Sequence, residues 1–258
     1  MKKIWVTALD HDEKKVQKIL STIRQYGLDG NGHFWQDDIK NMAWFSPKEA
    51  IVDKESCLWV ILGSGKSLET DSVRFGLALL TLTVQAEKGL GFPVLFVASE
   101  GDINNDVLPT PLKGADIIAS GSPSLGAKMV AKANTPIKEI DSDYRIDLHA
   151  NPNYGIWFEI GPSGDSVWNG ALLGVSNALI DAHGVGSAGK LPEKAILEYQ
   201  MQGLKLKLGE KEYTAWAVQN KLDSNNSYYV RVREMPESII FGPYSSEEEA
   251  SVNIINLY

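Results

Sequence analysis

The stretch from Cys57 to Ser99 constrains the fold of this chain more than any other. An uninterrupted apolar run, Cys57–Leu62, is followed by a polar loop and by Asp71–Glu87, which carries apolar residues at helical spacing. A second apolar run, Pro93–Ala98, closes the stretch. Continuous apolar strands are typical of parallel sheets that helices cover on both faces. The stretch therefore predicts a strand–helix–strand unit of a parallel sheet.

The same alternation of strand and helix extends through the rest of the first half. Ile4–Leu9 predicts a strand, and Glu13–Tyr26 predicts a helix because Asp12 can cap it and Gly27 can end it. Parallel strands joined by right-handed helical crossovers form a doubly wound sheet, so we predict a flavodoxin-like α/β domain over residues 1–135. Its other predicted elements are a short strand within 28–45, a helix from Ser46 to Val52, a strand at Ala115–Ala119 and a helix from Ser122 to Ala133.

After a predicted linker at residues 136–143, the sequence changes to the alternating pattern of half-exposed strands. The turn residues Gly209 and Glu210 predict a hairpin, and residues 245–248 predict the start of a final helix that reaches about Leu257. We therefore predict a β-rich α+β domain over residues 144–258. The segments predicted as strands are Tyr154–Ile160, Leu204–Leu208, Tyr213–Val218 and Tyr228–Arg233.

Composition limits the classes of function. The chain has 258 residues and a net charge of -8, and such an acidic balance argues against general nucleic-acid binding, which needs a basic surface. The single cysteine, Cys57, allows neither an internal disulfide nor a cysteine metal cluster, and we expect it to be a small core residue. The sequence contains no apolar run typical of a secretory signal or a membrane span, so we expect a cytoplasmic protein without a membrane partner.

Polar residues follow the predicted strands of the first half at the edge where doubly wound sheets bind ligands, outside the carboxyl ends of the strands. We therefore expect a ligand to lie against these strand ends and the start of the helix that follows Cys57–Leu62. The predicted ligand-binding residues are Asp10, His11, Ser64, Lys66, Ser67, Arg74, Ser99 and Glu100.

In the loop Gly63–Ser67, only the last three residues, Gly-Lys-Ser, match the pattern of a phosphate-binding P-loop. A P-loop needs a glycine five residues before its Gly-Lys-Ser, and Val60 occupies that position inside the predicted strand. Two alternatives stay open for Lys66: looser contact with an anion, or a plain connection from strand to helix.

A second glycine pattern, Gly184–Gly189, matches the spacing of a dinucleotide fingerprint. Pro192 follows almost at once, and the surrounding sequence is β-rich, whereas the fingerprint needs a helix. We expect a mobile surface loop here, with a cofactor loop as the alternative, and we predict no cofactor.

Acid–base chemistry is an alternative for the polar strand ends. Asp10, His11, Asp12, Glu100 and Asp102 could act in catalysis, whereas helix capping by Asp12 and a turn at residues 100–102 explain the same residues structurally. The four histidines, His11, His33, His149 and His183, lack metal-ligand spacing, so we expect each to be structural or exposed and predict no metal site.

Residues 46–99 resemble the TIR and nucleoside deoxyribosyltransferase-like branch of flavodoxin-fold domains. The resemblance lies in the short helix, the apolar strand, the loop with Ser64 and Ser67, and the small-residue segment Phe75–Ala78. It implies a nucleotide-type ligand at this edge. The family's catalytic glutamate would fall near Arg74, and Glu69 is one turn out of register, so the resemblance implies the fold without the N-glycosidic cleavage.

A shorter segment, Phe241–Ala250, resembles the end of a peptidoglycan-binding SPOR domain, although it also suits a common strand-to-helix turn. Taken together, the sequence favours a non-catalytic module that binds a nucleotide-like small molecule or a protein partner. The alternatives are an enzyme acting on a nucleotide or nucleoside, and a structural or assembly subunit that pairs with a protein partner or forms a homo-oligomer.

Overall fold

The computed structural model describes residues 1–244 and 251–258. Contacts between residues divide the chain into two compact units, which we call the α/β unit (Met1–Ile140 with Tyr258) and the β unit (Asp141–Leu257).

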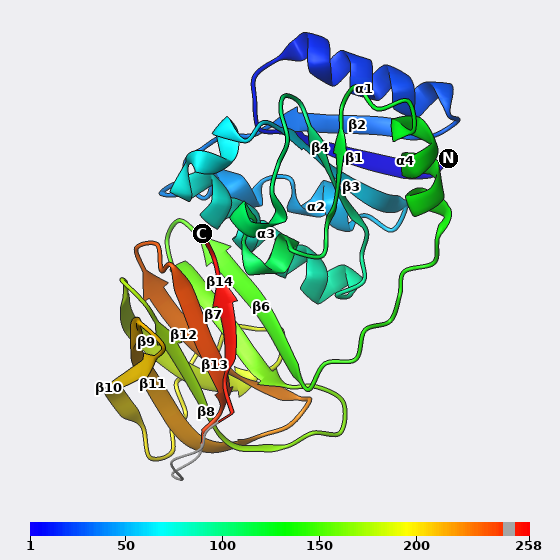
Figure 1. Cartoon of the computed structure of the whole chain (residues 1–258). Coiled ribbons are helices and arrows are strands. Elements are labelled where there is room, and N and C mark those ends of the chain that lie inside the picture. Colours follow the sequence, from blue (N-terminus) through cyan, green and yellow to red (C-terminus); the bar gives the residue numbers. More distant parts are fainter. Residues whose placement is uncertain (245–250) are drawn as a thin grey trace. The chain divides into compact units, whose positions relative to one another are not determined.

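The α/β unit contains a five-stranded parallel sheet in the order β2-β1-β3-β4-β5 (Figure 1). This is the flavodoxin-like doubly wound sheet predicted from the sequence. Its strands are β1 (Lys3–Ala8), β2 (Asp29–Phe34), β3 (Ser56–Gly63), β4 (Val94–Ala98) and β5 (Asp116–Ala119). Its α-helices are α1 (Glu13–Gln25), α2 (Lys48–Val52), α3 (Asp71–Lys88) and α4 (Leu125–Asn134).

Helices cover both faces of this sheet, α1 and α4 on one side and α2 and α3 on the other (Figure 1). Because side chains alternate along a strand, every second residue of β1, β3 and β4 packs against α1 and α4. On the strands, this core cluster contains Ile4, Val6, Ala8, Leu58, Val60, Leu62, Leu95 and Val97. On the helices, it contains Ile19, Leu20, Ile23, Leu125, Met129 and Ala133.

Local signals set the ends of the helices. The Asp12 carboxylate accepts a hydrogen bond of 3.1 Å from the backbone nitrogen of Lys15, so it caps α1 as predicted. The α3 helix begins at Asp71 and is preceded by a short 3-10 helix at Lys66–Glu69. The connection from β3 to α3 is therefore a compact helical turn rather than a wide phosphate-wrapping loop.

The β unit consists of two antiparallel sheets, in the orders β10-β11-β8-β13-β14 and β6-β7-β12-β9. The predicted hairpin at Gly209 is confirmed, since Leu208 of β10 pairs with Lys211 of β11. The first strands are β6 (Tyr144–Asn151), β7 (Gly155–Pro162), β8 (Trp168–Val175), β9 (Leu179–Ser187) and β10 (Met201–Leu208). The remaining strands are β11 (Lys211–Leu222), β12 (Asn226–Arg233), β13 (Ser238–Pro243) and β14 (Asn253–Asn256).

Two predictions for the second half are wrong. The final helix is replaced at Asn253–Asn256 by β14, which pairs with β13 and buries Ile255; its predicted start at 245–248 and part of the SPOR-like segment lie outside the described residues. The first part of the Gly184–Gly189 pattern is not a surface loop, because Gly184 and Gly186 lie within β9 and pair with β12, whereas Ala188 and Gly189 form a turn after the strand.

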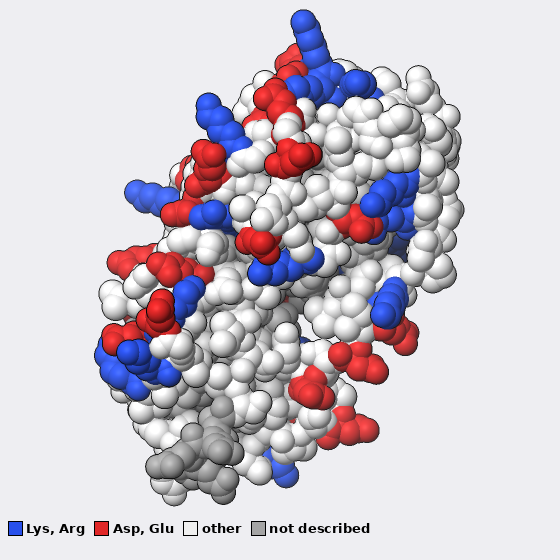
Figure 2. Space-filling view, in the orientation of Figure 1, with Lys and Arg blue, Asp and Glu red and all other residues white. Residues whose placement is uncertain are grey.

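The charged side chains on the face drawn in Figure 2 are of both signs and are interspersed over its described residues. An extended basic patch is therefore not seen on this face. Within the described ranges, no helix has both the length and the apolar composition needed to cross a bilayer.

Candidate functional site

A cluster of polar side chains lies at the carboxyl edge of the parallel sheet, and Asp10 is at its centre. The hydroxyl of Ser67 donates to Asp10 Oδ1 at 2.9 Å, and the hydroxyl of Ser99 donates to Asp10 Oδ2 at 3.2 Å. Ser64 Oγ lies 3.0 Å from Ser67 Oγ. Three strand-end loops, those after β1, β3 and β4, thus meet on one carboxylate. We call Asp10, Ser64, Ser67 and Ser99 the Asp10 cluster.

The loop after β3 folds around its own serines. The backbone nitrogen of Ser64 donates to Ser67 Oγ at 3.0 Å, and the backbone nitrogen of Ser67 donates to Ser64 Oγ at 3.3 Å. Gly63 lets β3 end close to the chain after β1, because a Cβ there would lie 2.7 Å from the Leu9 side chain. The close approach of Gly63 to the chain after β1 brings the two loops within hydrogen-bonding reach of each other.

This position is the topological switch point of the sheet. From β1 the chain moves to β2 on one side, whereas β3, β4 and β5 follow on the other side. Loops that leave adjacent strands in opposite directions open a crevice between them, and doubly wound proteins bind their ligands there. The Asp10 cluster lies at the loops after β1 and β3, which flank this point.

The charged residues near the Asp10 cluster are of both signs, and several of them form ion pairs with one another. Lys15 Nζ lies 2.5 Å from Glu100 Oε1 and 3.7 Å from Asp12 Oδ2. The hydrogen bond to Glu100 raises the pKa of Lys15, and the backbone N–H of Lys15 lowers the pKa of Asp12. Glu100 is thus engaged in an ion pair, and Lys66 is the exposed cation of the β3 loop.

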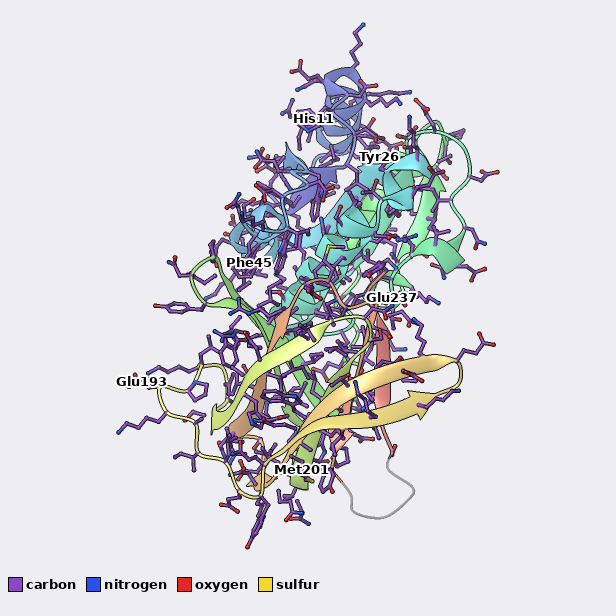
Figure 3. The ribbon with its side chains drawn as sticks, turned by 90° about the vertical axis from the view of Figure 1, so that its left-hand side faces the viewer. His11, Tyr26, Phe45, Glu193, Met201 and Glu237 are labelled. Atoms are coloured by element: carbon purple, nitrogen blue, oxygen red, sulfur yellow. The ribbon has the colours of Figure 1, made fainter. Side chains whose placement is uncertain are left out.

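Two of the predicted site residues are placed differently from the Asp10 cluster. His11, labelled in Figure 3, lies just before α1, and its ring stacks on Phe34 at the end of β2 with centroids 4.9 Å apart. The guanidinium of Arg74 forms an ion pair with Asp71, one turn earlier in α3. Asp10 instead receives its side-chain hydrogen bonds from serines.

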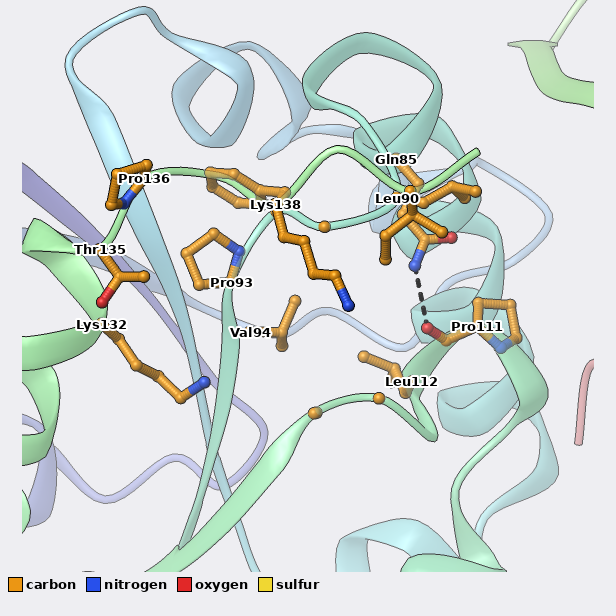
Figure 4. Close-up of a pocket in the computed structure, with 15 residues that line it drawn as sticks. Gln85, Leu90, Pro93, Val94, Pro111, Leu112, Lys132, Thr135, Pro136 and Lys138 are labelled. Carbon is orange, nitrogen blue, oxygen red and sulfur yellow. Dashed lines mark hydrogen bonds between the residues drawn. The ribbon is translucent and has the colours of Figure 1, made fainter. Parts of the chain in front are cut away.

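The cavities described for the α/β unit lie at the opposite edge of the sheet. One of about 320 Å³ lies beside Val94, which begins β4, and Ala115, which precedes β5. The ammonium groups of Lys132 and Lys138 point toward it, and Gln85 Nε2 donates to the Pro111 carbonyl at 3.1 Å in its wall (Figure 4). This cavity lies at the amino edge of the sheet, whereas doubly wound proteins bind their ligands outside the carboxyl ends of the strands.

A second cluster of polar residues, in the β unit, was not predicted from the sequence. Glu159 of β7 is buried, with 3% of its surface exposed, and lies 2.6 Å from His149 of β6. Burial would raise the pKa of Glu159, but hydrogen bonds from His149, Ser227 and the Gly189 backbone outweigh burial and hold that pKa below its ordinary value. The sequence does show that Asp147 and His149 are two residues apart and would share one face of a strand. It does not show that Glu159 lies beside them, because that depends on the register of β6 with β7.

Comparison with known proteins shows no family. No family model matches the sequence, and no curated protein matches it. The TIR and nucleoside deoxyribosyltransferase resemblance therefore stays a prediction, and its coarser content, a parallel α/β sheet in the first half, is what the structure contains. Among solved structures, the chain is similar to an NAD kinase from Archaeoglobus fulgidus in complex with ATP, at 11% identity, with 91% of each chain covered and a TM-score of 0.31.

Proposed function

We propose that the α/β unit binds a nucleoside or nucleotide at the Asp10 cluster and does not transform it. The observation that carries the proposal is the convergence of two hydroxyl donors, from the loops after β3 and β4, on the two oxygens of Asp10. In dinucleotide-binding doubly wound folds a carboxylate accepts hydrogen bonds from ribose hydroxyls, and Asp10 offers a carboxylate at the same edge of the sheet.

The bonds within the cluster suggest where a ribose would enter. The Ser67 bond to Asp10 is the shorter, at 2.9 Å, and it belongs to the self-bonded turn of the β3 loop. The Ser99 bond is 3.2 Å long, so a ligand hydroxyl could replace it at little cost. Lys66, exposed on the same loop, is then the cation available to a phosphate.

Arg74 favours binding over catalysis. In the resemblance described above, the catalytic carboxylate would fall near this position, and a guanidinium that pairs with Asp71 cannot serve as a nucleophile or general base. The enzyme alternative would need another base, for which Asp10 and Glu100 are the candidates. The assembly-subunit alternative needs no small ligand at all.

Thermal unfolding of the full chain with adenosine, ATP or NAD tests the proposal. A ligand that binds only the folded state raises the melting temperature, so at least one of the three should do so. Asp10→Asn removes the charge that ribose hydroxyls would contact and should weaken binding about 10- to 100-fold. Lys66→Ala should weaken ATP binding and leave adenosine binding unchanged.

Asp29→Asn provides a matched control. Asp29 is an exposed carboxylate that begins β2, at the amino edge of the same sheet, so its loss should not change ligand binding. Mass spectrometry of the incubated ligand separates binding from turnover. The proposal is overturned if none of the three ligands shifts the melting temperature, or if Asp10→Asn and Asp29→Asn bind equally well; chemical conversion of a ligand would favour the enzyme alternative.

A further inference from the structure

Strand pairing in the β unit brings three potential metal ligands to one face of a sheet. In β6, Ile146 and Leu148 are buried, so Asp147 and His149 point to the opposite face. Asp147 is paired directly with Glu159 of the neighbouring strand β7. Two residues of one strand and one of the next therefore converge on the same patch.

The ligand atoms are close enough for one ion to contact all three. One atom each from Asp147, His149 and Glu159 lies within 4.8 Å of the others. His149 Nε2 and Glu159 Oε2 are 2.6 Å apart, which is a hydrogen-bonded pair. A metal ion binds these same two atoms once it replaces the shared proton and they separate slightly.

A second shell of hydrogen bonds orients the carboxylate of Glu159. Its Oε1 accepts hydrogen bonds from the Ser227 hydroxyl at 2.6 Å and from the Gly189 backbone at 2.8 Å. These bonds hold one oxygen and leave Oε2 directed at His149. Outer-shell partners of this kind are what fix the first ligands of protein metal sites.

Glu159 is buried although it lies on the sheet face opposite Phe158 and Ile160. The segment after β9 contributes the Gly189 amide that donates to Glu159, and Glu193, labelled in Figure 3, belongs to the same segment. Isolating a carboxylate from water costs free energy unless charged or hydrogen-bonded partners compensate.

We propose that Asp147, His149 and Glu159 form a divalent metal site of the zinc type. One imidazole and two carboxylates are ligands that Zn²⁺ accepts in proteins, and three protein ligands leave a coordination position open to water or substrate. Mg²⁺ and Ca²⁺ prefer sites built from oxygen alone, so they bind this set more weakly.

Isothermal titration of the chelator-treated full chain with ZnCl₂ tests the site, and Co²⁺ serves as a spectroscopic probe. We expect one high-affinity ion per chain and visible absorption bands from bound Co²⁺. His149→Ala should weaken zinc binding by about 100-fold or more, and Asp147→Asn by about 10-fold. Loss of a residue that binds the metal directly should weaken binding at least as much as loss of a residue that only hydrogen-bonds to a metal ligand. Asp147→Asn leaves the bonds from Ser227, Gly189 and His149 to Glu159 in place, so it decides the test if His149→Ala fails to fold.

Asp181→Asn is the matched control on the same sheet, because Asp181 pairs with Arg231 at 2.7 Å and Arg233 at 2.5 Å. His11→Gln controls for binding by a surface histidine of the other unit. Both variants should bind zinc like the unchanged chain. The proposal is wrong if the unchanged chain binds no zinc, or if His149→Ala and Asp147→Asn bind it as tightly as the controls do.

Discussion

His33 illustrates how a single half-buried side chain couples folding to pH. It lies in β2, and its Nδ1 accepts a hydrogen bond of 3.0 Å from the indole nitrogen of Trp5 in β1. This bond requires an unprotonated Nδ1. Burial disfavours the charged imidazolium and lowers the pKa of His33 to about 4. The native state therefore holds His33 neutral under conditions in which the unfolded chain protonates it.

This difference predicts a loss of stability in mild acid. The contribution of neutral His33 is complete above the ordinary histidine pKa of 6.5 and decreases as the pH falls from 6.5 to about 4. The total loss is about 3 kcal/mol, at about 1.4 kcal/mol for each unit of pKa difference. Urea unfolding of the full chain between pH 7 and pH 4 measures it.

Comparison of variants isolates this effect from other titrating groups. His33→Gln should show a smaller decrease in unfolding free energy over that pH range than the unchanged chain. His11→Gln should show the same decrease as the unchanged chain, because His11 is exposed. Equal pH profiles for all three proteins would contradict the role of His33.

At the scale of elements, the glycines of β9 determine how the segment after it folds back. A Cβ on Gly186 would lie 2.8 Å from Pro192 Cβ, and one on Gly184 would lie 3.1 Å from Pro192 Cγ. The two glycines that match the spacing of a dinucleotide fingerprint therefore leave space for the Pro192 ring. The packed segment also contains Gly189, which donates to Glu159.

We predict that Gly186→Val displaces this segment. Overpacking against Pro192 should lower the unfolding free energy by about 1–3 kcal/mol. It should also increase hydrogen exchange at the Gly189 and Lys190 amides, which donate to Glu159 and Tyr229. Ser187→Ala, at the exposed end of the same strand, is the control and should leave both amides protected; unchanged exchange in Gly186→Val would contradict the prediction.

The same elements show what local sequence can and cannot predict. The α1 helix was predictable because its cap, its apolar spacing and its glycine stop are all local. The prediction of a final helix was wrong because β14 is stabilised by its pairing with β13, which the local sequence pattern does not reveal. Because the carboxyl ends of parallel strands meet at one edge of a sheet, the sequence predicted that Asp10, Ser67 and Ser99 lie near one another. The proximity of His149 and Glu159 could not be predicted in this way, because it depends on the register of β6 with β7.

At the scale of the whole molecule, the α/β unit has a hydrophobic core of its own. The core between the parallel sheet, α1 and α4 is built only from residues of the α/β unit. The last of these elements, α4, contributes Leu125, Met129 and Ala133, all nearly fully buried. We therefore propose that residues 1–140 form a domain that folds by itself.

Two fragments test this proposal. Fragment 1–140 should unfold cooperatively on heating when followed by circular dichroism. Fragment 1–119 lacks α4 and should not, because three buried side chains contribute about 5 kcal/mol, comparable to the stability of a small domain. The domain assignment fails if 1–140 shows no cooperative transition, and the assigned role of α4 fails if 1–119 melts like the longer fragment.

The lysines of β10 affect whether a strand from another molecule can add to the free edge of this sheet. Among the described strands, β10 pairs only with β11, so its outer backbone groups are open to a further strand. Leu204 and Leu206 pack inward, while Lys205 and Lys207 are exposed between them. An incoming neutral strand would have to desolvate two ammonium groups, whereas an acidic strand would neutralise them. We therefore expect this edge to disfavour addition of a neutral strand and to favour addition of an acidic one.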